Sequence, residues 1–162
     1  EEEKESMDKA MQSYAACLEK STGKKLNDIL GTGAAGGLGF AFLWGLPNVE
    51  LKPGIDIVLE AVGLTNELKD ADVVVTGEGC LDFQTAMGKV PVGVAQAAKN
   101  YNCKVIAFAG SVTEEAKKCN EEGIDAFFSI LPGVCSLDEA MDTETAQKNM
   151  RNTAEQVFRL LV

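Results

Sequence analysis

Three charged side chains that could carry out chemistry lie within residues 73–93, "VVVTGEGCLDFQTAMGKVPVG". Glu78 and Asp82 are carboxylates four residues apart, and Lys89 follows seven residues later. Paired carboxylates can hold Mg²⁺ or divide the tasks of metal ligand and proton acceptor, and a Lys ammonium is suited to phosphate. We therefore predict Asp82, Glu78 and Lys89 as catalytic residues, with Glu78 and Asp82 as the ligands of a Mg²⁺ ion.

Neutral groups beside these charges are predicted to bind substrate or nucleotide. Gln84 and Thr85 supply hydrogen-bonding groups, while Gly77 and Gly79 allow a sharp turn on either side of the first carboxylate. Ser111 follows the next apolar run and is expected to reach the same place. The predicted binding residues in this half of the chain are Gly77, Gly79, Gln84, Thr85 and Ser111.

Each charged residue also has a purely structural interpretation. Glu78 could cap a turn, Asp82 could be the N-cap of the following helix, and Lys89 could be solvated. Gly88 and Lys89 do not form a phosphate-binding P-loop, because no glycine stands at the required position before them and a valine follows the lysine. Cys80 is interpreted as a small filler, because the chain contains no His that could activate it.

A second glycine-rich segment, "GTGAAGGLGFAFLWG", leads into an apolar helix that runs through Leu43 and Trp44. Its glycines formally satisfy the GxGxxG pattern, and Asp56 lies where a dinucleotide fingerprint needs an acid, but no clear strand precedes them. Glycines before a helix permit positive φ and the approach of anions, although close helix packing would need them as well. We predict that Gly33, Gly36 and Gly37 bind substrate or nucleotide.

The elements expected to position these residues form an α/β fold. Short runs that are apolar throughout, at residues 73–76, 105–109 and 127–130, alternate with helical segments. This pattern is typical of a parallel, doubly wound, Rossmann-like sheet with flanking helices and right-handed crossovers. Because ligands bind outside the carboxyl ends of such strands, the mouth of the site is expected at the following positions: Thr76, Gly77, Glu78 and Gly79, then Gly110 and Ser111, then Pro132 and Gly133.

Helical patterns fill the rest of the chain. A helix is expected over residues 55–63, and Ser136 with Glu139 predicts a capping box before the C-terminal helices. Two apolar stripes are interpreted as core packing: Met7, Ala10, Met11, Tyr14, Ala15 and Leu18; and Met150, Ala154, Val157, Phe158 and Leu161. Residues 45–54, rich in Pro and Gly, are the best internal boundary, between a helical, glycine-loop part (1–45) and an α/β part (55–162).

Composition limits the kinds of partner. The 162 residues include 25 acidic and 15 basic residues, a net charge of −10, which argues against binding to nucleic acid or to an anionic membrane. No run of about 18 apolar residues could cross a bilayer. Five cysteines without a CxxC pair indicate a reducing, cytoplasmic location, and the missing initiator Met suggests a piece of a longer protein.

Several stretches resemble the type I glycerate kinase family in order and spacing: "GTGAAGGLGFAFL", "LKPGIDIVLEAVGL", "ADVVVTGEGCLDFQTAMGKVPVGVAQAAK", "VIAFAGSV" and "CSLDEAM". The resemblance runs from about Lys24 to the C-terminus, and its most specific motif is TGEGxLDxQTxxGKxPxGVA. It implies a two-domain α/β kinase that uses ATP and Mg²⁺ to phosphorylate D-glycerate in an interdomain cleft. The motif positions of the family fall on Glu78, Asp82, Gln84, Thr85 and Lys89, beside the glycines at 33, 36 and 37.

Two departures from the family qualify this expectation. Cys80 replaces the Arg that members usually have in GEGRLD, a cation that could hold the glycerate carboxylate or a phosphate. The N-terminal portion, with a DSFKGS-like segment, is absent, so residues 1–162 resemble a C-terminal fragment that needs that portion as its partner and could also form a homo-oligomer. The fragment alone is expected to be inactive. Alternatives are a noncatalytic nucleotide- or anion-binding regulatory module and an NAD-binding oxidoreductase domain.

Overall fold

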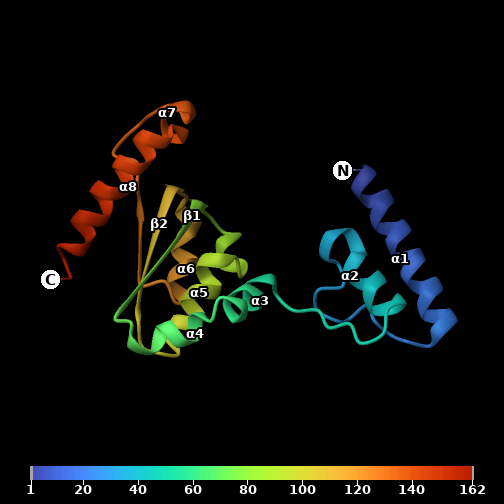
Figure 1. Cartoon of the computed structure of the whole chain (residues 1–162). Helices are drawn as coiled ribbons and strands as arrows, with labels where there is room; N and C mark the ends of the chain where they lie inside the picture. The colour runs from blue at the N-terminus through green and yellow to red at the C-terminus, as the bar shows by residue number, and fades with distance from the viewer. Residues whose placement is uncertain (1, 162) are drawn as a thin grey trace. The chain divides into compact units, whose positions relative to one another are not determined.

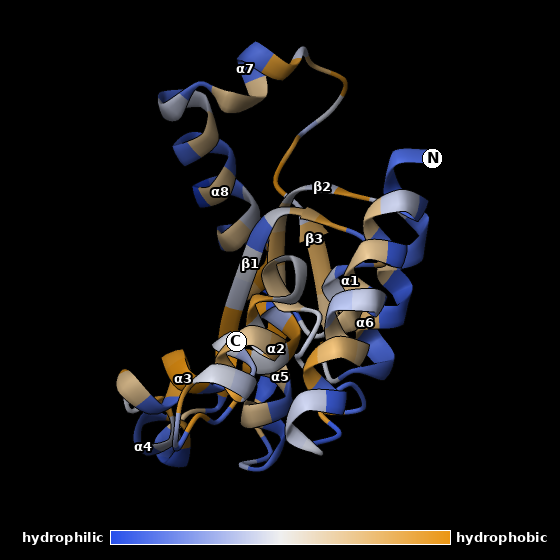
Figure 2. Cartoon of the chain, turned by 90° about the vertical axis from the view of Figure 1, so that its right-hand side faces the viewer, coloured by the Kyte–Doolittle hydropathy of each residue, from blue (hydrophilic) through white to orange (hydrophobic). Residues whose placement is uncertain are grey.

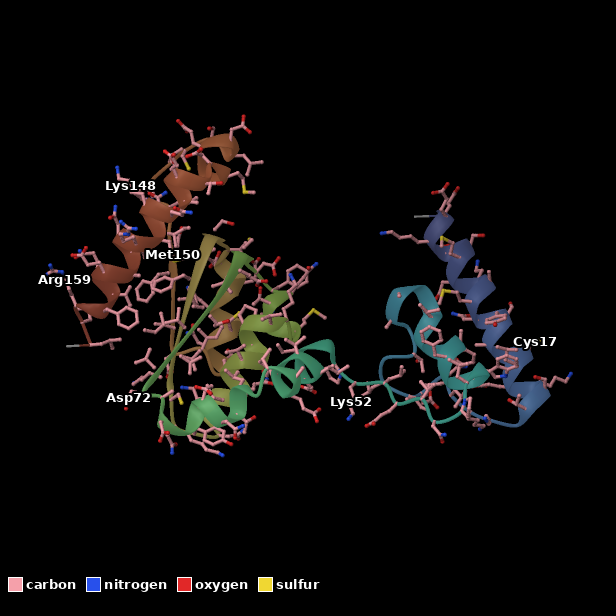
Figure 3. All side chains as sticks on the ribbon, viewed as in Figure 1. Cys17, Lys52, Asp72, Lys148, Met150 and Arg159 are labelled. Atoms are coloured by element: carbon pink, nitrogen blue, oxygen red, sulfur yellow. The ribbon has the colours of Figure 1, made fainter. Side chains whose placement is uncertain are left out.

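The chain forms two compact units, residues 1–54 and residues 55–162, in a computed structural model that describes residues 2–161. The first unit contains two helices, α1 (Glu2–Thr22) and α2 (Ala34–Gly45), and the second contains the sheet with its helices (Figure 1). The division follows residues 51–53, which have no regular secondary structure and include Lys52 (Figure 3). We describe the two units separately.

In the first unit, glycines determine how the chain enters α2. Gly23, at φ 70°, follows the last residue of α1, and the turn before α2 brings the backbone of Gly31 so close to Gly39 that a Cβ atom at Gly39 would overlap the Gly31 carbonyl oxygen. Ala35, Gly36 and Gly37 then adopt left-handed conformations before the regular part of α2 begins. Gly adopts this region without strain and Ala rarely does, so Ala35 is the unusual member of the three.

The apolar stripe of α1 is not core in this chain, which corrects the sequence-based interpretation. Ala15 is the only residue of α1 that is buried within the described part of the helix. Met7 is 68% exposed and Tyr14 is 52% exposed. Helical periodicity located the stripe but did not identify what covers it, because periodicity reports that a face is apolar and not what it contacts.

The division falls after the first residue of α3 (Gly54–Ala61), a helix that the sequence predicts for residues 55–63 and that belongs otherwise to the second unit. The further elements of the second unit are α4 (Leu64–Glu67), the 3-10 helix η1 (Leu68–Asp70), β1 (Val73–Leu81), the 3-10 helix η2 (Thr85–Met87), α5 (Val90–Lys99), β2 (Lys104–Val112), the 3-10 helix η3 (Glu114–Lys117), α6 (Lys118–Glu121), β3 (Ala126–Ser129), α7 (Leu137–Met141) and α8 (Thr143–Phe158). Strands and helices alternate along the chain, as the sequence indicates.

The three strands form one parallel sheet in the order β1-β2-β3, which confirms the predicted fold class. Val75 pairs with Ile106, and Phe108 pairs with Phe128. β1 is longer than predicted: it continues through residues 77–81, where a loop was expected. The signal was present in the sequence, because Thr76, Glu78 and Cys80 alternate with two glycines, and this period of two is that of a strand.

Helices cover both faces of the sheet, with α5 and α6 on one face and α8 on the other (Figure 1). The first face has the larger core, in which Val105, Ala107 and Ala109 of β2 pack with Val92 of α5 and Cys119 of α6. The second face packs Ile106 and Phe108 against Val157 of α8. The strands β2 and β3 are accordingly hydrophobic, whereas α1 is hydrophilic over much of its length (Figure 2). Residues buried on both faces explain the unbroken apolar runs.

The C-terminal helices begin where their capping residues dictate. The Ser136 hydroxyl accepts a hydrogen bond from the Glu139 backbone N–H, and the Glu139 carboxylate accepts one from the Ser136 N–H, so the predicted capping box is confirmed. Asp142 then caps α8 through the Thr145 N–H at 2.9 Å. Arg159 at the end of α8 pairs with Glu155 and points away from the sheet (Figure 3). Among residues 2–161, no helix is long and apolar enough to cross a membrane.

Candidate active site

The three charged side chains predicted within the segment 73–93 lie where β1 connects to η2 and α5. Glu78 is in β1, Asp82 lies between β1 and η2, and Lys89 directly precedes α5. Glu78 lies on β1 opposite Ala109 of β2, and it shares a face with Thr76 and Cys80. This is the face that α5 and α6 cover, because Ala109 belongs to the core on that side. Glu78 is therefore half-buried on a rigid strand near its carboxyl end, and not in a mobile loop.

Thr85, in the first position of η2, connects the two predicted catalytic carboxylates. Its hydroxyl donates a hydrogen bond to Glu78 Oε1 and accepts one from the Asp82 backbone N–H at 3.2 Å. The side chain is completely buried. Thr85 therefore holds the carboxylates in place from inside the protein, and a direct contact between Thr85 and a ligand, as predicted from the sequence, would require this side chain to become exposed.

Asp82 is held in its ionised form. Its Oδ1 accepts hydrogen bonds from the backbone N–H groups of Gln84 at 2.9 Å and Thr85 at 3.0 Å, and the Lys89 ammonium lies 3.7 Å away. Partial desolvation raises the pKa of Asp82, but the backbone hydrogen bond from Thr85, the charge of Lys89 and the hydrogen bond from Gln84 together lower it below its ordinary value. A carboxylate with a lowered pKa is a weak proton acceptor, so Asp82 is suited to holding negative charge.

The two carboxylates fit a Mg²⁺ ion that keeps water and phosphate among its ligands. Glu78 and Asp82 both contact the Thr85 segment, so they can contribute hard oxygen ligands on the same side of η2. Within residues 2–161, no group of three or more His, Cys, Asp or Glu side chains could hold a metal ion. A site with two carboxylates is typical of Mg²⁺ bound together with substrate phosphates, and not of a complete protein cage.

The other predicted binding residues differ in what they can reach. A Cβ atom on Gly77 would overlap the Phe108 carbonyl oxygen of β2, so Gly77 is needed for strand packing. Gly79 has open space where a Cβ atom would be. Gln84 is exposed, and Ser111 is an exposed residue that pairs with Cys80 across the two strands. Gly79, Gln84 and Ser111 are therefore accessible from solvent near the carboxylates.

The predicted glycines at 33, 36 and 37 belong to the first unit. Gly33 and Gly36 have open space in place of a side chain, and a Cβ atom on Gly37 would approach the Met11 methyl group. These glycines border a cavity between α1 and α2, which we consider separately below. The structure of each unit thus contains one of the two groups of residues that the sequence analysis selected.

Sequence reasoning missed Cys119, which lies in α6 beneath the carboxylates. The side chain is completely buried, and burial, followed by the negative charges of Glu78 and Asp82, raises the pKa of the Cys119 thiol. The thiol is therefore protonated and acts as a small apolar support for the site. The surrounding sequence, "TEEAKK" before it and "NEEG" after it, does not indicate that Cys119 lies close to the site. A cysteine in a charged amphipathic segment is typical of any buried helix face.

Comparisons with known proteins show the family and the fold to which this chain is similar. A family model described as the glycerate kinase family matches residues 1–162. The glycerate kinase of Bacillus subtilis (strain 168) is 46% identical over 151 residues, which cover 93% of this chain and 39% of that protein. The glycerate 2-kinase of Escherichia coli (strain K12) is 43% identical over 134 residues, which cover 83% of this chain and 35% of that protein.

A solved structure is also similar. The crystal structure of the Salmonella typhimurium LT2 protein named as glycerate kinase 2 aligns with a TM-score of 0.67 at 42% identity. The alignment covers 95% of this chain and 38% of that one. The chain therefore spans about two fifths of the length of the proteins it matches.

Proposed function

Because the chain belongs to the glycerate kinase family, we propose that it is the C-terminal part of an ATP-dependent enzyme that phosphorylates a hydroxyl group of D-glycerate. The observation that carries this proposal is the connected group of Glu78, Thr85, Asp82 and Lys89 near the carboxyl end of β1. Two carboxylates and a cation at that edge of a parallel sheet are the groups that phosphoryl transfer requires.

The residues divide the work according to their contacts. The glycerate hydroxyl oxygen forms a bond to the γ-phosphorus of ATP, the bond from that phosphorus to the bridging oxygen of ADP breaks, and Glu78 accepts the hydroxyl proton. Asp82, which its backbone hydrogen bonds keep ionised, holds charge and not a proton. Lys89 is 41% exposed and can move from Asp82 to a phosphate oxygen.

Mg²⁺ would be bound by Glu78 and Asp82 and would neutralise charge on the phosphates. The exposed Ser111 and Gln84 would position glycerate, together with Cys80 where the family has Arg. Phosphoryl transfer depends almost entirely on such positioning and on charge neutralisation. We therefore expect that the 162-residue chain, which spans 39% of its Bacillus subtilis relative, needs the rest of the enzyme for turnover.

The test uses a full-length glycerate kinase that contains this chain, with a coupled assay for ADP. Glu78→Gln and Asp82→Asn should each lower kcat by about two orders of magnitude or more, because charge or proton acceptance is lost while shape is kept. Gln84→Ala, an exposed neighbour, is the matched control and should mainly change KM. If both carboxamide variants keep their kcat and lose only thermal stability, the group is a capped turn and the alternative of a noncatalytic nucleotide-binding module is favoured.

A further inference from the structure

A cavity of about 560 Å³ lies between α1 and the start of α2, wholly within the first unit. Its lining includes Met11 and Tyr14 of α1 and Phe40 of α2, which give it mostly apolar walls with two aromatic rings. Phe40 is 6% exposed and Tyr14 is 52% exposed, so one ring lies at the bottom of the cavity and the other borders solvent. This cavity explains why the apolar stripe of α1 is open: part of that stripe is a cavity wall.

Polar groups in the cavity are few and are mostly neutral. Gln12 and Asn27 supply amides, and the Asp8 carboxylate is held by a hydrogen bond from the Gln12 side chain at 2.8 Å. None of the described lining residues is a Lys or an Arg. A phosphate chain inside this cavity would therefore meet a carboxylate and no cation, which argues against the phosphate role that glycines before a helix usually suggest.

The backbone of the cavity also departs from ordinary geometry. Ala35, a non-glycine residue, lines the cavity at φ 51°, followed there by Gly36 and Gly37 in the same left-handed region. This turn keeps side chains off one wall, since two of its three residues have none. A Cβ atom on Gly36 would meet nothing within 4 Å, so this part of the wall is open, whereas Gly37 faces the Met11 methyl group. Open space in a cavity that also has aromatic walls can accept a planar ligand.

From this lining we infer that the cavity binds the purine nucleoside part of a nucleotide. The volume is sufficient for a base and its ribose, and a flat base can stack on Tyr14. The amides of Gln12 and Asn27 can pair with the polar edge of the base, and the Asp8 carboxylate can accept hydrogen bonds from ribose hydroxyls. The phosphates would then extend out of the cavity. This inference rests on the proposed function, which supplies the nucleotide.

The test is a two-dimensional NMR titration of the ¹⁵N-labelled 162-residue chain, without Mg²⁺. Adenosine should shift the backbone signals of cavity residues such as Gly36 and Gly37 in a saturable manner. AMP should bind no more tightly than adenosine, because its phosphate gains no cation. Inorganic tripolyphosphate should leave these signals unchanged and should not displace adenosine. The titration needs no catalysis, so it can succeed or fail independently of glycerate phosphorylation.

Variants identify the wall that carries the binding. Tyr14→Ala should weaken adenosine binding by about fivefold or more, since stacking of one base on an aromatic ring contributes at least that factor. Tyr14 is 52% exposed, and unchanged NMR signals of first-unit residues away from the cavity will verify that Tyr14→Ala keeps the fold of this unit. Ser13→Ala is the control, because Ser13 is exposed on the same helix and does not line the cavity.

Three results would overturn the inference. Adenosine at about 10 mM could leave the cavity signals unshifted, which would show that no nucleoside binds. Tripolyphosphate could shift the same signals as strongly as adenosine, which would assign the glycines to phosphate. Tyr14→Ala could bind adenosine as tightly as the control, which would place the base elsewhere.

Discussion

Replacing Thr85 by Val removes the hydroxyl that joins the two carboxylates and keeps the side-chain volume nearly constant. Glu78 then loses a hydrogen bond to a charged acceptor, worth about 1.5–3 kcal/mol. The Asp82 N–H loses its acceptor, at a cost of about 1–3 kcal/mol if it stays unpaired. The added methyl group of Val returns about 0.8 kcal/mol. The net expectation is a loss of about 2–5 kcal/mol in the free energy of unfolding of the second unit.

Thr85→Ser distinguishes the contribution of the hydroxyl group from the contribution of the packed methyl group. Ser keeps the hydrogen-bonding group and loses one buried methyl group, which should cost about 1 kcal/mol. Because Thr85 is completely buried, neither effect is diluted by solvent. The two variants should therefore differ by about 1–4 kcal/mol, which corresponds to about 5–900-fold in the equilibrium constant for opening.

Amide hydrogen exchange is the appropriate assay, because it reports each unit by its own residues. The backbone amides of β2 should exchange faster in Thr85→Val than in Thr85→Ser, while the amides of α1 should be unchanged in both. In the full-length enzyme, Thr85→Val should also lower kcat, and Thr85→Ser should restore most of it. Equal protection in Thr85→Val and the unmodified chain would refute the role of the hydroxyl, as would equal losses in the two variants.

Three further changes test separate parts of the second unit. Gly77→Ala should destabilise the second unit by about 1–3 kcal/mol or more, because the new Cβ atom overlaps the Phe108 carbonyl oxygen. Thermal unfolding should then show a lower Tm. Gly79→Ala is the control, because a Cβ atom at Gly79 meets nothing within 4 Å. Although desolvation raises the pKa of Asp125, a lysine and a backbone N–H lower it overall, so its stabilising effect is complete above its unfolded pKa and is lost as pH falls towards the folded value. Asp125→Asn should accordingly lose less stability than the unmodified chain between about pH 5 and pH 3, as measured by urea denaturation; an identical loss would contradict this. Cys80→Arg in the full-length enzyme should lower KM for glycerate by up to about tenfold with kcat similar, and an unchanged or raised KM would remove Cys80 from the glycerate site.

The parallel sheet could be predicted from sequence because its strands are apolar on both faces. Val105, Ala107 and Ala109 face one core, and Ile106 and Phe108 face the other, so the whole run reads as hydrophobic. The end of β1 was missed for the opposite reason. Residues 77–81 contain two glycines and an acid, which are rare in strands, and all of them except Gly79 pair with β2, which extends equally far.

The residues of the candidate site were predicted from the sequence, but the hydrogen bonds that join them through Thr85 were not. The sequence placed Glu78, Asp82 and Lys89 together, and the structure brings Asp82 within 3.7 Å of Lys89. The role of Thr85 as the buried link could not be predicted, because burial depends on how η2 packs and no local pattern reports it. The open face of α1 could not be predicted for a similar reason. The spacing of Met11 and Tyr14 is compatible with packing in a core and equally with the wall of a cavity.

The sheet order has a consequence for handling this chain in solution. Within the part of the chain that the structure describes, β1 pairs on one side with β2 and is the outer strand of the sheet. It is nine residues long, and Val75 on it is 49% exposed. A long outer strand that begins with three valines is a template for pairing with another chain, and natural proteins protect such edges with charged residues. At high concentration the isolated chain should therefore self-associate through β1, and Val75→Lys should delay that aggregation.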